Sequence, residues 1–140
     1  QYAGVKFLNA VSSAIQRHTK PQDTIFAFMN GYVLHAHRQI FPDTVYEVSS
    51  TSLFPNLSDK EAREYKLLSP NILLSYFKEK KAKVIVLERP GRLDALSVEI
   101  SANYKDEIES ILTTDYVLLE KVHKYPENIS GPVVYIYRAK

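Results

Sequence analysis

The sequence predicts an α/β fold: a three-layer sandwich with a mainly parallel sheet of about five strands and an antiparallel C-terminal edge hairpin. Two short runs, 24–29 and 84–87, are apolar at consecutive positions, which is typical of strands covered by helices on both faces. Segments with helical apolar periodicity lie between such runs. The last two strand-like segments, 116–122 and 133–137, are joined by too few residues for a parallel crossover, so they should pair antiparallel.

Length and composition are those of one globular α/β domain over residues 1–140. Of the 140 residues, 45% are hydrophobic and 24% are charged, and the formal net charge is +2. These proportions exclude a disordered chain, a collagen-like repeat and a strongly charged tail. The cationic residues are spread evenly, which argues against nucleic acid as a partner. The chain has no cysteine, which excludes disulfides, zinc ribbons and thiol nucleophiles.

Residues 1–19 are expected to form a leading amphipathic helix. Its apolar residues recur at three- and four-residue steps and should form one buried stripe. They are Val5, Leu8, Val11 and Ile15. The helix should end near Arg17, because cationic side chains suit a helix C-terminus.

The next segment contains two expected strands. The run 24–29 should be a central strand, 32–38 a short helix or turn, and 44–48 a second strand. The hydroxyl residues 49–52 then form a polar loop, in which they satisfy backbone groups.

Two helix starts can be recognised from capping residues. Ser58 followed by Glu61 is a capping box, so a helix should begin at Asp59. Ser69 followed by Pro70 predicts another helix, with the serine as N-cap. Beyond these, the pattern predicts a strand at 84–87, a helix carrying Leu93, Leu96 and Ile100, and a helix after Tyr104 carrying Ile108, Ile111 and Leu112.

Polar side chains follow the predicted strands, where open α/β sheets bind their ligands. We name this set the polar rim and expect it to contact a ligand or a partner. It consists of Asn30, His35, His37, Arg38, Glu88, Arg89 and Arg92.

No familiar catalytic or cofactor motif accompanies the polar rim. The four glycines are far apart, which disfavours a dinucleotide or phosphate-binding loop. His35 and His37 could ligate a metal, but no third ligand lies nearby and solvated histidines are favoured. Glu88 could be a functional acid, although an ion pair with a neighbouring arginine is favoured. We therefore assign no catalytic residue, cofactor or metal to this segment.

Two further features bear on partners and location. Tyr135 and Tyr137 share one face of an expected edge strand, either as half-buried packing, which is favoured, or as a partner surface. The sequences at 56–58 and 128–130 match the N-glycosylation acceptor pattern, which weakly supports an extracytoplasmic location.

The order of these segments resembles a known family. The amphipathic helix is followed by Pro21-Gln22-Asp23-Thr24-Ile25-Phe26-Ala27 and by a tyrosine-containing loop that ends at Arg38. Later, Val84-Ile85-Val86-Leu87-Glu88 follows a helix, Tyr104 precedes a short helix, and the chain closes on Tyr135-Ile136-Tyr137-Arg138. This pattern resembles the soluble C-terminal domain of polytopic type C membrane glycosyltransferases, similar to the dolichyl-phosphate-mannose protein mannosyltransferase superfamily. The resemblance covers nearly the whole chain and rests on order rather than on a signature motif.

The resemblance implies an accessory role on the extracytoplasmic face of a cell membrane. In such enzymes the catalytic acidic residues lie in the membrane portion, which also handles a polyprenyl-phosphate sugar donor. This segment would contact the membrane portion of its own parent chain and recognise a protein or glycan acceptor, or stabilise the enzyme. We expect it to be the C-terminal part of a longer chain. It has no tryptophan, so it departs from the oligosaccharyltransferase branch, whose soluble domain carries a Trp-Trp-Asp motif.

Two other functions stay open at this point. A free-standing cytoplasmic α/β enzyme or ligand-binding protein, methyltransferase-like, would use the polar rim as its pocket. A protein-interaction domain would instead use the tyrosine-bearing strand.

Overall fold

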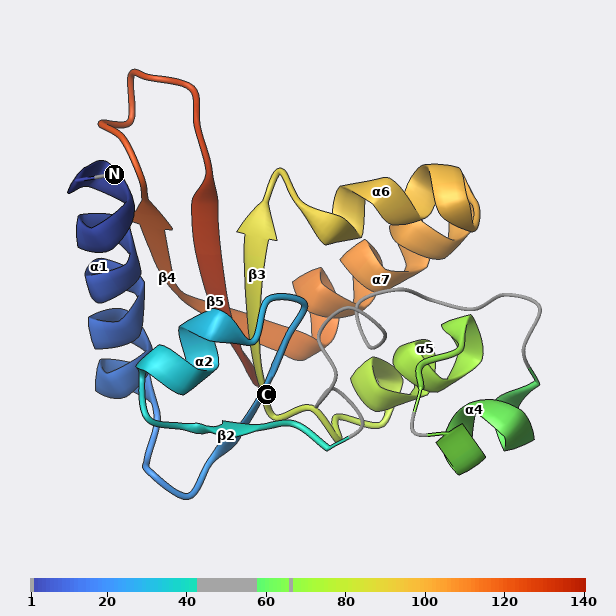
Figure 1. Ribbon diagram of the computed structural model, residues 1–140. Helices are drawn as coiled ribbons and strands as arrows, with labels where there is room; N and C mark the ends of the chain where they lie inside the picture. The colour runs from blue at the N-terminus through green and yellow to red at the C-terminus, as the bar shows by residue number, and fades with distance from the viewer. Residues whose placement is uncertain (1, 43–57, 66) are drawn as a thin grey trace.

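The computed structural model describes residues 2–42, 58–65 and 67–140, which fold around one mixed five-stranded sheet (Figure 1). The strand order is β2-β1-β3-β5-β4. The strands are β1 (Thr24–Ala27), β2 (Gln39–Ile40), β3 (Val84–Arg89), β4 (Tyr116–His123) and β5 (Val133–Ala139). β1 is parallel to β2 and β3, whereas β5 is antiparallel to β3 and β4. The α/β class, the five strands and the antiparallel C-terminal hairpin agree with the sequence prediction, but only two of these four pairings are parallel.

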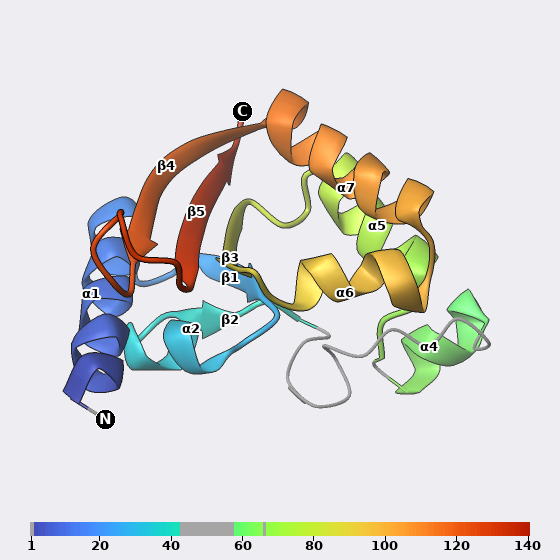
Figure 2. The ribbon, with the colours of Figure 1, turned by 90° about the horizontal axis from the view of Figure 1, so that it is seen from above.

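The helices cover both faces of the sheet (Figure 2). They are α1 (Tyr2–His18), α2 (Gly31–His35), α4 (Asp59–Tyr65), α5 (Pro70–Lys78), α6 (Arg92–Glu99) and α7 (Ala102–Asp115). Because side chains alternate along a strand, β3 serves two cores. Val84 and Val86 pack with α1 and α2, and Ile85 and Leu87 pack with α5, α6 and α7.

The two predicted helix caps are confirmed. The backbone amide of Glu61 donates to Ser58 Oγ over 3.1 Å, and the Ser58 amide donates to Glu61 Oε1 over 3.4 Å. The Ser69 hydroxyl accepts from the amide of Ile72 over 3.2 Å. Helix α7 begins earlier than predicted, at Ala102, because Ser101 caps it by accepting from the Tyr104 amide.

The buried face of α1 differs from the predicted stripe. Val11 and Ile15 are buried, but Val5 is 61% exposed, and Phe7 and Ala14 complete the buried face instead. Each three-residue step falls short of a full helical turn, so two successive steps carry Val5 about 120° away from Val11. The buried residues Phe7, Val11 and Ala14 are separated by one step of four and one of three, which keeps them on one side of the helix.

Other predictions are corrected or lie outside the described residues. The predicted strand 44–48 and loop 49–52 fall outside them, and β2 is a two-residue strand that no apolar pattern indicates. Strand β5 lies between β3 and β4, so the tyrosine-bearing strand is not at the edge. A hairpin pattern does not specify which of its two strands joins the rest of the sheet.

In the part of the chain that the structure describes, no helix is long and apolar enough to cross a membrane.

Candidate functional site

The structure divides the polar rim between two edges of the sheet. Asn30 follows β1, and Glu88 and Arg89 end β3, so these three lie at the carboxyl edge of the parallel strands. Arg38 lies at the opposite edge, where its guanidinium donates to Thr19 Oγ1 over 2.8 Å and to the Thr19 carbonyl over 3.2 Å. The cause is α2, which carries the chain from the carboxyl end of β1 back to the amino end of β2.

The remaining rim residues are placed by their helices. His35 ends α2, and its Nε2 lies 3.0 Å from Asn9 Oδ1 on α1. His37 is exposed beside Arg38 and has a left-handed backbone, with φ of 55°. Arg92 opens α6 and forms a two-bond ion pair with Glu99. These residues therefore do not converge on one ligand position.

Neighbouring residues Glu88 and Arg89 point to opposite faces of the sheet. Glu88 lies on the α1–α2 face, where its Oε1 accepts from the Tyr32 hydroxyl over 2.7 Å. Burial raises the pKa of Tyr32 above its ordinary value, and the hydrogen bond to the Glu88 carboxylate adds to the rise. Tyr32 is thus held as a neutral donor to Glu88.

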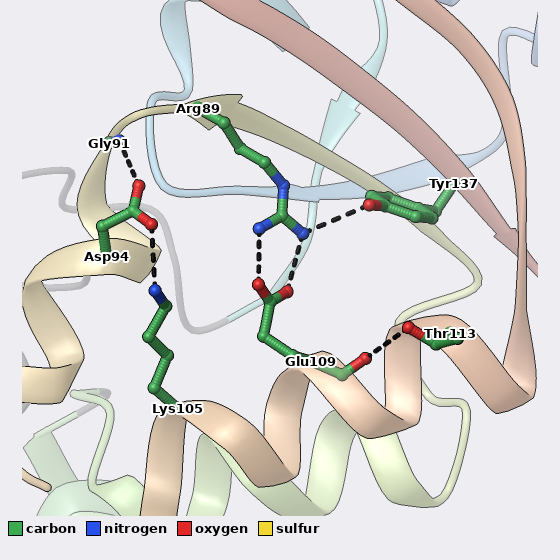
Figure 3. Close-up of polar contacts among 7 residues, drawn as sticks. All are labelled: Arg89, Gly91, Asp94, Lys105, Glu109, Thr113 and Tyr137. Carbon is green, nitrogen blue, oxygen red and sulfur yellow. Dashed lines mark hydrogen bonds and ion pairs between the residues drawn. The ribbon is translucent and has the colours of Figure 1, made fainter. Parts of the chain in front are cut away.

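Arg89 lies on the α6–α7 face, where it bonds to Glu109 and Tyr137 (Figure 3). Its guanidinium donates two 2.8 Å hydrogen bonds to the carboxylate of Glu109 on α7 and one 3.2 Å bond to the Tyr137 hydroxyl. Burial opposes the charge on Arg89, but the bonds to Glu109 and Tyr137 outweigh it and raise the pKa of Arg89. The side chain is only 18% exposed.

Two tyrosine rings of β5 lie beside the Arg89 side chain. The Arg89 guanidinium lies 5.1 Å from the ring centroid of Tyr135, and Lys121 Nζ lies 5.3 Å from the same centroid. The rings of Tyr135 and Tyr137 are nearly parallel, with centroids 6.3 Å apart. We name Arg89, Glu109, Lys121, Tyr135 and Tyr137 the arginine cluster.

Sequence reasoning identified Arg89 as a candidate but missed its partners. Lys121 faces Tyr135 directly in the β4–β5 register. Glu109 comes from a helix 20 positions away. The two tyrosines were recognised as sharing a face, and the structure confirms that they share one. The approach of Arg89 to these rings depends on the pairing of β5 with β3, for which the sequence carries no signal.

A second polar contact fixes the start of α6 beside the arginine cluster (Figure 3). The amide of Gly91 donates to Asp94 Oδ2 over 2.8 Å, and Lys105 Nζ lies 3.2 Å from Asp94 Oδ1. A Cβ at Gly91 would lie 2.3 Å from the Glu88 carbonyl oxygen, so the tight approach needs a glycine. Burial works against the charge on Asp94, but the Gly91 amide and Lys105 outweigh it and lower the pKa of Asp94.

We expect Asp94→Asn to destabilise the protein by about 0.5–1 kcal/mol at neutral pH, because it weakens this N-terminal contact. The stability from the charged carboxylate is present above the unfolded pKa of about 4. It is lost as the pH falls through the lower pKa of the folded state. Urea unfolding at several pH values should show the difference from the unaltered protein shrinking in acid. Asp106→Asn on the exposed side of α7 is the matched control, and an equal effect there would contradict this role of Asp94.

The two carboxylates near this edge do not form a pair. The carboxylates of Glu88 and Glu109 lie on opposite faces of the sheet and each is bonded to a neighbour. Among the described residues, no three histidine, aspartate or glutamate side chains are arranged to hold a metal ion. In the arginine cluster, the Tyr135 ring lies near two cations of the domain itself.

Comparison with protein-family models, with curated proteins and with solved structures finds no match for this chain. A functional proposal for this chain therefore rests on its sequence, its fold and its contacts.

Proposed function

We propose that this chain is the three-layer extracytoplasmic accessory domain of a polytopic membrane glycosyltransferase that uses a lipid-linked sugar donor. In this proposal the domain recognises the acceptor or stabilises the enzyme, and the chemistry takes place in the membrane portion of the same parent chain. The observation that carries the proposal is that each charged group at the end of β3 and just after it is bonded to a side chain elsewhere in the domain. Glu88, Arg89 and Arg92 each have a partner within the domain.

This pairing favours an accessory role for a physical reason. A general acid or base must reach a proton of the substrate, and a nucleophile must reach its reacting atom. The Glu109 carboxylate accepts both of its short bonds from Arg89, and Glu88 accepts from Tyr32. The two bonds from Arg89 therefore occupy both oxygens of the Glu109 carboxylate. The segment order resembles a family whose catalytic acids lie elsewhere in the chain, which agrees with this arrangement.

The experiment that tests the proposal is a topology assay on the full-length gene product in membranes. An epitope tag is placed after Lys140, and protease is added to sealed cells or vesicles from the extracytoplasmic side. We expect cleavage to release the tagged domain while upstream segments stay in the membrane. Protease added after detergent is the control that the domain can be cut at all.

The opposite result identifies the alternative. If the tag appears on a free cytoplasmic protein of the size of this chain, the glycosyltransferase proposal is wrong. A ligand-binding protein would then be the better description, and the arginine cluster would be the first place to look for its ligand.

A further inference from the structure

The peptide between β1 and α2 joins an asparagine to a glycine. Of the asparagines in the chain, only Asn30 is followed by glycine. The backbone nitrogen of the next residue can attack the side-chain amide of an asparagine, and glycine hinders this attack least because it has no Cβ. In the unfolded chain, Asn30-Gly31 is therefore the pair most reactive toward deamidation, the loss of ammonia that converts an asparagine to an acid.

The reaction needs no partner other than water. The Gly31 nitrogen bonds to Asn30 Cγ, the Cγ–Nδ2 bond breaks, and ammonia leaves with the proton of the Gly31 amide. Water then opens the five-membered ring at either of its carbonyl carbons and leaves aspartate or isoaspartate at position 30. Isoaspartate carries the backbone through the side-chain carbons, so it lengthens the chain just before α2.

The backbone of the folded protein prevents this ring from closing. Asn30 has φ of −68° and ψ of −16°. At this ψ the Gly31 nitrogen nearly eclipses the Asn30 nitrogen, whereas ring closure requires it to turn toward the Asn30 Cβ. That rotation also moves the Asn30 carbonyl, which accepts from the Leu34 amide over 3.0 Å in the first turn of α2. The attack therefore requires α2 to begin to unwind.

Packing holds both the asparagine and the helix in place. Asn30 is only 2% exposed, so its side chain has little room to swing toward Gly31. Helix α2 has five residues, and a helix of this length depends on tertiary packing for its stability. Val33 is fully buried, and the Tyr32 hydroxyl donates to Glu88 over 2.7 Å. These few contacts are what local opening of α2 has to break.

We propose that Asn30-Gly31 is a deamidation site that the native fold masks, and that only molecules in which α2 has opened are modified. Deamidation is much slower than the opening and closing of a short helix, so its rate should follow the fraction of open molecules. The product carries a carboxylate at a buried position, which opposes repacking. Opening of α2 thereby becomes an irreversible loss of native protein, whichever function the domain has.

The experiment compares the rate of deamidation in the native and the unfolded chain. Samples are kept at mildly alkaline pH with and without concentrated guanidinium chloride, and the tryptic peptide 18–38 is analysed by mass spectrometry with fragmentation that distinguishes isoaspartate. We expect conversion at Asn30 to be at least about tenfold slower in the native protein, equivalent to an opening free energy of about 1.4 kcal/mol or more. Asn128 is exposed but precedes isoleucine, so it should react far more slowly than Asn30 in guanidinium.

Two truncations in the same helix test whether α2 is the gate. Val33→Ala leaves a cavity beneath α2 and should raise the native rate several-fold without changing the rate in guanidinium. Leu34→Ala, at a 57% exposed position, is the matched control and should change neither rate appreciably. Tyr32→Phe removes the bond to Glu88 but keeps the ring, and it should act in the same direction as Val33→Ala. Circular dichroism should show that each variant is folded.

A third change tests the chemistry rather than the gate. A Cβ at Gly31 would meet no atom within 4 Å, and the glycine does not have a positive φ, so Gly31→Ala should fold as the unaltered chain does. The added methyl group hinders attack on Asn30, and conversion in guanidinium should slow markedly.

Equal rates at Asn30 in the native and the unfolded chain would show that the fold does not mask the site. Masking by α2 is also wrong if folded Val33→Ala and Tyr32→Phe both react at the rate of the unaltered protein. If Gly31→Ala reacts in guanidinium as fast as the unaltered chain, the modification does not proceed through attack by the residue 31 nitrogen.

Discussion

Replacing Phe26 with alanine should lower the free energy of unfolding by about 3–5 kcal/mol, the range for buried Phe→Ala changes. Phe26 is fully buried in β1, on the face that packs against α5, α6 and α7. Its ring lies edge-on to Phe28, Phe41 and Phe77, with centroids 5.3, 6.0 and 5.2 Å away. Alanine would lose the buried surface and these aromatic contacts, and would leave a cavity among rigid rings.

The measurement is chemical unfolding, in which the midpoint should fall while the slope against denaturant stays unchanged. Phe26→Leu refills part of the space and should lose markedly less stability. Met29→Ala, a truncation at a 45% exposed position just beyond β1, should change stability by about 0.5 kcal/mol or less. A loss below about 1 kcal/mol for Phe26→Ala would contradict the packing described for this core.

Glu109→Gln should cost about 1–3 kcal/mol, because it leaves the Arg89 charge mostly buried against a neutral acceptor. The range lies below that for a fully buried pair, since the Glu109 side chain is 36% exposed and water can reach it. The hydrogen bond from Arg89 to the Tyr137 hydroxyl does not involve Glu109, so it should remain and still hold the guanidinium.

A neighbouring ion pair on the same helix provides the matched control. Glu107 pairs with Lys78 on the surface, with side chains 45% and 53% exposed, so Glu107→Gln should have almost no effect. A double-mutant cycle of Glu109→Gln with Arg89→Met isolates the coupling between the two residues. If Glu107→Gln and Glu109→Gln cost the same, Arg89 is not held by Glu109 in the way described.

The local elements of this fold follow from short-range chemistry, which is why they were predictable. The serine caps at 58 and 69 act over three residues, and both appear where the sequence places them. Strand β3 was predicted from a run apolar on both faces, and its residues serve both cores. The short hairpin connection required antiparallel pairing, which β4 and β5 show.

Predictions failed where a local pattern was extended too far. The stripe assigned to α1 drifted around the helix and included an exposed Val5. Strand β2 has only two residues, Gln39 and Ile40, and its pairing with β1 stabilises it without any apolar run of its own. Polar residues after β1 were assigned to one edge, but α2 moves Arg38 to the other.

The α/β class, the two serine caps, strands β1 and β3, and Arg89 as a polar group at the end of β3 were therefore predictable from the sequence. The position of β5 beside β3, and the bonds of Glu109 and Tyr137 to Arg89, emerge only in the folded domain. Caps and apolar periodicity depend on residues within one turn or one strand. The contacts of Arg89 depend on strand order and on how α7 packs over the sheet, which are set by the burial of both cores together.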